Sequence, residues 1–140
     1  MTLVRVNGYN VPEGLYYSKE YEWAKLEGDK VRVGITDYAQ KQLREIVYVE
    51  IPSVGTVLKQ NEPYGTVESV KSVSDLVAPI SGSVEQVNEE VTSKPELLNE
   101  DPYNKGWLLI IKPSSMDELK NLMDAAKAAG WHQSLLKEAK

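Results

Sequence analysis

The chain has 140 residues, and its 16 lysines and arginines against 21 aspartates and glutamates give a net charge of −5. This length suits one domain with a substantial hydrophobic core, and an acidic balance without a basic cluster argues against nucleic acids and anionic membranes as partners. The absence of cysteine and the presence of a single histidine exclude disulfides, thiolate nucleophiles and sites built from paired histidines.

Nothing in the sequence indicates a membrane or secretory destination. No apolar run approaches the roughly 20 residues of a membrane-spanning helix, and residues 1–12 lack the features of a signal or transit peptide. We therefore expect a cytoplasmic protein. Because the one histidine, His132, lies in the tail and no Gly-x-Ser-x-Gly motif is present, a hydrolase triad is disfavoured, and we expect a protein that is not an enzyme by itself.

The first predicted elements are a hairpin and a short helix. Residues 23–26 and 30–35 read as two strands around the turn 27–29, with apolar residues alternating along the second strand. Thr36 is placed to cap a short helix over residues 37–43. Residues 46–51 then read as a continuous apolar strand that ends at Pro52.

A pattern of Pro-x-x-Gly-x-Val followed by Asn-Glu occurs twice, at a constant offset of 27 residues. The matched positions are Pro52 and Pro79, Gly55 and Gly82, Val57 and Val84, Asn61 and Asn88, and Glu62 and Glu89. The pattern is loose enough to arise by coincidence in a β-rich chain, but five identities at one offset favour a true repeat. Each copy is too short to bury a core alone, so we predict two strand–turn–strand elements that pack against each other, joined by an exposed hairpin.

Lys71 is the one lysine in the connecting segment 67–76, VESVKSVSDL. It could be an ordinary solvated lysine, as most lysines are. A lysine nucleophile would need burial or nearby positive charge, whereas the neighbouring Glu68 and Asp75 favour the ammonium form. The chemical use that remains is as an acceptor, to which a separate enzyme attaches an acyl group that then serves as a tether.

The second half is predicted to contain a helical turn, a strand and a terminal helix. The turn is expected at residues 95–98, followed by a loop over 99–102 and a strand over 106–112. Ser115 and Glu118 form the pattern of a capping box, which predicts a helix that ends at Gly130. Its expected buried face comprises Leu119, Leu122, Met123 and Ala126.

With these residues in view, the chain resembles the H-protein family of the glycine cleavage system, the lipoyl carriers of that system. The resemblance covers roughly residues 17–123. Its densest segments are YSKEYEW at 17–23, VGITDYAQ at 33–40, VESVKSVSD at 67–75, PISG at 79–82 and NEDPY at 99–103. The Glu-Ser-Val-Lys context of Lys71 differs from the Asp-Lys-Ala of acyltransferase lipoyl domains and from the Met-Lys of biotin carriers.

The resemblance implies a mainly β fold, a flattened barrel-sandwich hybrid of two quasi-symmetric sheets with peripheral short helices and a C-terminal helix. We expect residues 1–140 to form a single lipoyl-carrier domain, within which the leader 1–16 and the tail 131–140 have no assigned role. The family also implies a monomer that docks transiently with its partners.

The resemblance further implies that lipoate is attached to Lys71 by a lipoate ligase or lipoyl transferase. The lipoyl arm would accept an aminomethyl group from glycine at a pyridoxal-phosphate-dependent glycine decarboxylase. It would then pass the one-carbon unit to a tetrahydrofolate-dependent aminomethyltransferase and be reoxidised by dihydrolipoamide dehydrogenase. The carrier itself would contribute no catalytic residue and no metal.

Further site residues are carried over from the family by position. Glu68 and Gly82 match the residues that the lipoylating enzyme recognises, although Gly82 could equally be a turn glycine of the repeat. Glu22, Ser69 and Asp75 match positions near a cleft that receives the loaded arm, but each could be an ordinary solvated residue.

Two positions depart from the family pattern. Tyr21 stands where many members have histidine, and Arg44 stands where glycine often precedes Glu45. Two other functions also remain open: an H-like lipoate carrier that serves lipoyl relay or sulfur oxidation, and an interaction domain that is not modified at all.

Overall fold

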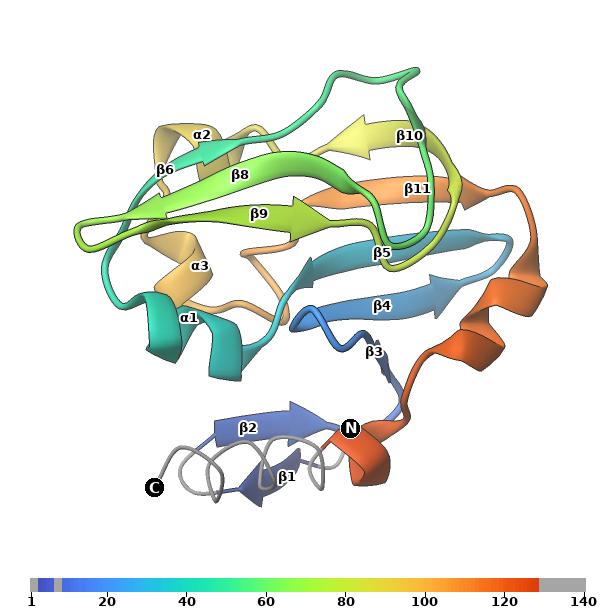
Figure 1. Cartoon of the computed structure of the whole chain (residues 1–140), viewed down its shortest axis with the longest axis horizontal. Coiled ribbons are helices and arrows are strands. Elements are labelled where there is room, and N and C mark those ends of the chain that lie inside the picture. Colours follow the sequence, from blue (N-terminus) through green and yellow to red (C-terminus); the bar gives the residue numbers. More distant parts are fainter. Residues whose placement is uncertain (1–2, 7–8, 129–140) are drawn as a thin grey trace.

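The computed structural model describes residues 3–6 and 9–128, with side chains from Asn10 onward. Its fold is mainly β, with two sheets facing each other and short helices at the periphery (Figure 1), which confirms the predicted class. The six-stranded sheet has the order β3 (Tyr16–Tyr17), β4 (Glu22–Glu27), β5 (Lys30–Ile35), β11 (Leu109–Pro113), β10 (Gly82–Val87) and β7 (Val57–Leu58). The three-stranded sheet has the order β6 (Ile46–Glu50), β8 (Pro63–Ser69) and β9 (Val73–Val77).

The main hydrophobic core lies between these sheets. Val31 and Val33 of β5 and Ile111 of β11 enter it from the six-stranded sheet, while Val67 and Leu76 enter it from the other. Because successive strand residues point to opposite faces, this alternation buries one face of each strand. The core therefore fixes which side of the β8–β9 hairpin faces the six-stranded sheet.

The predicted hairpin and capped helix are confirmed. Strands β4 and β5 pair antiparallel. Helix α1 (Asp37–Leu43) follows them, and the hydroxyl of Thr36 accepts a hydrogen bond from the backbone N–H of Ala39 at 3.1 Å. This cap satisfies a donor that would otherwise have no partner in the first turn.

The two copies of the repeat pair with each other. In β7 and β10, Leu58 lies opposite Gly82 and Val57 opposite Ser83. The offset also relates two strands, because adding 27 to the bounds of β6, 46 and 50, gives 73 and 77, the bounds of β9. The second copy departs from strand–turn–strand, since α2 (Glu90–Ser93) occupies the place that β8 takes after the first copy.

The predicted continuous C-terminal helix is wrong. A 3₁₀ helix, η1 (Met116–Asn121), ends at Leu122, and the backbone of Met123 pairs with that of Tyr17 through two 2.7 Å hydrogen bonds. Met123 thus pairs with the edge strand β3 instead of continuing the helix, and a new helical turn begins only at residue 125. Gly130, His132 and the tail 131–140 lie outside the described residues.

The predicted capping box is also replaced by a tertiary contact. The hydroxyl of Ser115 does accept from the backbone N–H of Asp117 at 3.3 Å. Glu118, however, turns to Ser81 and accepts from its backbone N–H at 2.7 Å and from its hydroxyl at 2.8 Å. The carboxylate therefore holds η1 against the start of β10 instead of completing the cap.

The segment before β11 is helical further along the chain than predicted. Helix α3 spans Leu97–Glu100, so the turn expected at residues 95–98 is shifted and Asn99 is helical rather than in a loop. The Asn99 side chain accepts from the backbone N–H of Ile46 at 3.0 Å and donates to the carbonyl of Arg44 at 2.6 Å. The polar side chain of Asn99 makes a tertiary contact. Judged from the neighbouring sequence alone, the same polarity indicates a loop.

The leader contains a small hairpin of β1 (Leu3–Val6) and β2 (Tyr9–Pro12). It is attached to the body through Asn10, whose N–H donates to the carboxylate of Asp37 at 2.8 Å. The carbonyl of Asn10 also accepts from the hydroxyl of Tyr103 at 2.6 Å. Over the described part of the chain, no helix is long and apolar enough to cross a membrane.

Arg44 gives a test of backbone strain. It ends α1 with φ 69° and ψ −140°, a backbone conformation that residues other than glycine adopt at a cost of about 1–3 kcal/mol. Replacement by glycine removes that strain but adds about 0.5–1 kcal/mol of backbone entropy to the unfolded chain. We expect Arg44→Gly to raise the free energy of unfolding by about 1 kcal/mol, measured by urea denaturation.

The matched control is Arg44→Ala, which removes the guanidinium but keeps the β-carbon and hence the strain. It should show no comparable gain. A glycine variant no more stable than the alanine variant would contradict this account of Arg44.

Candidate functional site

Lys71 lies at the tip of the β8–β9 hairpin, formed by residues 70–72, and is exposed. In Figure 1 this hairpin projects beyond α1 and α3 at one end of the molecule. The predicted exposed hairpin between the two copies is confirmed. The amine of Lys71 is therefore open to another protein.

The tip is held by short-range hydrogen bonds centred on Ser69. Its hydroxyl accepts from the backbone N–H groups of Lys71 at 3.2 Å and Ser72 at 3.1 Å. The N–H of Val70 donates to the carbonyl of Glu45 at 3.2 Å, which ties the tip to the segment between α1 and β6. Ser69 is buried and does not line the neighbouring cavity, so the structure places it behind the tip as a support for the turn.

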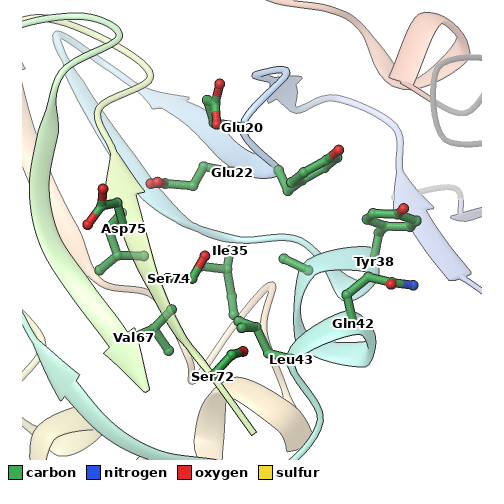
Figure 2. A pocket seen from close by; sticks show the side chains of 13 residues that line it. Glu20, Glu22, Ile35, Tyr38, Gln42, Leu43, Val67, Ser72, Ser74 and Asp75 are labelled. Carbon is green, nitrogen blue, oxygen red and sulfur yellow. The ribbon is translucent and has the colours of Figure 1, made fainter. Parts of the chain in front are cut away.

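A cavity of about 340 Å³ lies beside the hairpin, between β9, α1 and the start of β4 (Figure 2). Part of its wall is apolar, from Ile35, Leu43, Val67 and Leu76. The acidic side of the lining comes from Glu20, Glu22 and Asp75, with Ser72 and Ser74 of the hairpin nearby. Two residues carried over by the family resemblance, Glu22 and Asp75, thus line one cavity.

Glu22 is the buried polar group of this cavity, with 1% of its surface exposed. Its carboxyl oxygens accept from the hydroxyl of Tyr64 at 2.6 Å and from the backbone N–H of Val77 at 2.7 Å. Tyr64 lies on β8 and Val77 on β9, so one side chain from the six-stranded sheet joins both strands of the hairpin. Glu22 is therefore a link between the sheets and not a solvated surface residue.

The burial of Glu22 changes its protonation. Desolvation raises the pKa of its carboxyl from 4.5 to about 8, and the hydrogen bonds from Tyr64 and Val77 oppose that rise only in part. The pKa of Tyr64 is raised as well, because its hydroxyl is desolvated and faces Glu22. Near neutral pH the pair is thus mostly uncharged, and a cation entering the cavity would favour ionisation of Glu22.

Two tyrosines that sequence analysis did not assign to the site also line the cavity. The rings of Tyr21 and Tyr38 have centroids 5.0 Å apart, an ordinary spacing for an aromatic pair. Tyr21, the residue that departs from the family's histidine, has φ 67°. A non-glycine residue in this conformation is uncommon and costs backbone strain.

Glu68 and Gly82, the residues predicted to be recognised by a lipoylating enzyme, lie in different places. Glu68 is near the tip, three residues before Lys71, whereas Gly82 lies beyond the far end of β9. Gly82 is not a turn glycine, because it begins β10 between β7 and β11. A β-carbon there would lie 2.2 Å from the carbonyl oxygen of Lys112, so close strand packing already requires glycine.

Comparison with known proteins connects this arrangement to one family. A model of the glycine cleavage H-protein family matches residues 15–135. The glycine cleavage system H protein of Geobacillus thermodenitrificans is 54% identical over 120 residues, covering 86% of this chain and 94% of that protein. The protein of the same name from Bacillus licheniformis is 51% identical over 129 residues, covering 92% and 98%.

A solved structure gives the same result. The crystal structure of a glycine cleavage system H protein from Mycobacterium marinum matches with a TM-score of 0.81 and 38% sequence identity. The match covers 87% of this chain and 98% of that one. Similarity thus extends over sequence and fold together.

The pKa of Glu22 predicts a pH dependence of stability. The folded protein holds a proton on Glu22 up to about pH 8, whereas the unfolded chain releases it near the ordinary value of 4.5. Stability from this group is therefore complete below about pH 4.5 and is lost as the pH rises toward 8, at up to about 1.4 kcal/mol per pH unit.

Glu22→Gln keeps the shape of the side chain but cannot titrate. We expect the difference in unfolding free energy between the variant and the wild type to shift in favour of the variant from pH 5 to pH 8. Urea denaturation at several pH values measures this difference. A difference that stays constant over this range would show that Glu22 does not hold a proton in the folded protein.

Proposed function

Since the chain belongs to the glycine cleavage H-protein family, we propose that it is a lipoyl carrier of the glycine cleavage system with Lys71 as its attachment site. The observation that carries this proposal is the position of Lys71, exposed at the tip of a braced hairpin and next to a cavity. A tether needs this combination, because an enzyme must reach the amine while its position on the protein stays defined.

Attachment of lipoate would use Lys71 as an acceptor. The Lys71 ammonium first loses a proton, and the neutral nitrogen then forms an amide bond with the carboxyl carbon of an activated lipoyl donor. The bond to the donor's leaving group breaks, and the nitrogen loses a second proton. When bound, the lipoyl group would supply a disulfide that opens so that one sulfur carries an aminomethyl group. Unloading would leave a dithiol, which has to be reoxidised to the disulfide. We propose that a lipoate ligase or lipoyl transferase performs the attachment and recognises Glu68 and Gly82.

The cavity has the chemistry to receive such an arm. Ile35, Val67 and Leu76 offer apolar contacts for a hydrocarbon chain, whereas Glu22 and Asp75 offer acceptors for an amine at its end. A cation that enters the cavity favours ionisation of Glu22, and the desolvated carboxylate then attracts this cation more strongly than a surface carboxylate would. We propose that Glu22 and Asp75 hold the amine end and that the apolar wall limits access of water.

The remaining partners follow from this role. We propose that a pyridoxal-phosphate-dependent glycine decarboxylase loads the arm, a tetrahydrofolate-dependent aminomethyltransferase unloads it, and dihydrolipoamide dehydrogenase reoxidises it. The chain would serve each of these enzymes as a monomeric cytoplasmic substrate and would contribute no catalytic residue. Residues 1–140 would work as one carrier domain.

The proposal is tested by intact-mass measurement after incubation with a lipoate ligase, lipoate and ATP. We expect the wild type to gain the mass of one lipoyl group and Lys71→Arg to gain none, since arginine keeps the positive charge but cannot serve as the acceptor. The exposed Lys59 gives the matched control, and Lys59→Arg should be loaded like the wild type. Loading of Lys71→Arg, or no loading of the wild type, would contradict the assignment.

A further inference from the structure

The outer face of the three-stranded sheet carries, next to the hairpin tip, a row in which two exposed apolar residues flank a glutamate. Tyr48 of β6 lies opposite Glu68 of β8, and Glu68 lies opposite Val73 of β9. Residues directly opposite in antiparallel strands point to the same face, with β-carbons about 4.5–5.5 Å apart. Tyr48 is 50% exposed and Val73 62% exposed, and the three residues together are called the tip row here.

The apolar exposure is confined to the end of the sheet that carries Lys71. The next row with direct pairing is polar and consists of Glu50, Thr66 and Asp75. At the tip itself, Val70 is 62% exposed. Isolated exposed apolar residues are normal, but a tyrosine and valines gathered beside one reactive group indicate a contact surface.

Glu68 gives this surface a charge. It lies between Tyr48 and Val73, and no ion pair to it is found among the described residues. A partner that covers the two apolar side chains would also desolvate this carboxylate unless it supplied a cation. The complementary surface therefore combines an apolar groove with a lysine or arginine.

We infer that the tip row is the docking surface for the enzyme that acylates Lys71, with Tyr48 and Val73 as its apolar contacts on either side of Glu68. This inference rests on the proposed function of Lys71. The acylating enzyme must bring the unmodified lysine side chain, which is shorter than the completed lipoyl arm, into its active site. The rim of that site therefore has to cover the residues around the tip. Enzymes that act on the completed arm meet its far end and need no such close approach.

The test measures the rate of loading rather than its end point. Tyr48→Thr and Val73→Thr put threonine, a residue with high β-propensity, at these exposed strand positions. The two variants are compared with the wild type singly and together. The probe is a lipoate ligase with lipoate and ATP, and kcat/KM is followed by intact mass. We expect the double variant to lose at least tenfold in kcat/KM and each single variant about threefold, while all of them still reach complete loading.

The matched control is Val57→Thr. Val57 is 79% exposed on β7, in the other sheet, and this variant should stay within twofold of the wild type. Glu68→Gln should also slow loading and weaken its dependence on salt, because the pairing with the enzyme's cation is lost. Urea denaturation of each variant shows whether it is folded. If the double variant is not folded, the test relies on the Val73→Thr variant alone.

The outcomes separate this inference from the proposed function. If the wild type is loaded and a folded tip-row variant is loaded at the same rate, the inference is overturned and the role of Lys71 remains intact. A wild type that never loads would overturn both. Once fully loaded, the double variant should support glycine–bicarbonate exchange by a glycine decarboxylase like the wild type, and a tenfold loss there with unchanged loading would assign the row to that enzyme instead.

Discussion

The buried carboxyl group of Glu22 joins the two sheets beside the hairpin that carries Lys71. It reaches from β4 to Tyr64 on β8 and Val77 on β9, at 2.6 and 2.7 Å. Without these bonds, a carboxyl group and a backbone N–H would be buried without partners, which costs more than the bonds themselves contribute. The same contact places the hairpin against the six-stranded sheet and forms one wall of the cavity, so the architecture of the site depends on it.

Next to this link, the backbone of the hairpin turn is held by hydrogen bonds, whereas the amine of Lys71 is exposed. The hydroxyl of Ser69 and the carbonyl of Glu45 hold the turn, while the side chain of Lys71 points to no fixed partner in the described structure. Two strained residues, Tyr21 and Arg44, border the same region. Such conformations persist only where surrounding contacts impose them; here Tyr21 packs on Tyr38, and Arg44 ends α1 just before the residue that contacts the tip.

Local patterns in the sequence were enough to predict the β4–β5 hairpin, the Thr36 cap and the exposed position of Lys71, because each depends on residues close together in the chain. The 27-residue offset also predicted that β7 would pack against β10. The interactions that define the cavity are of another kind. Glu22 and Tyr64 are 42 residues apart, and nothing near either one indicates that they meet.

The errors have the same origin. The C-terminal helix is interrupted because Met123 pairs with Tyr17, and Glu118 leaves its cap for Ser81. Asn99 is helical because its side chain bonds to the segment that follows α1. In each case a tertiary contact competes with a local preference, and only the folded arrangement shows which one prevails.

The central claim, that a group carried on Lys71 takes part in glycine cleavage, is tested most directly by isotope exchange. The lipoylated chain is mixed with a glycine decarboxylase known to be active with its own carrier, and incorporation of labelled bicarbonate into glycine is measured. The account predicts rapid exchange that depends on loading, with only background exchange for the chain without lipoate. Exchange that stays at background for the fully loaded chain would contradict the glycine-cleavage role and favour a lipoate carrier that serves other enzymes.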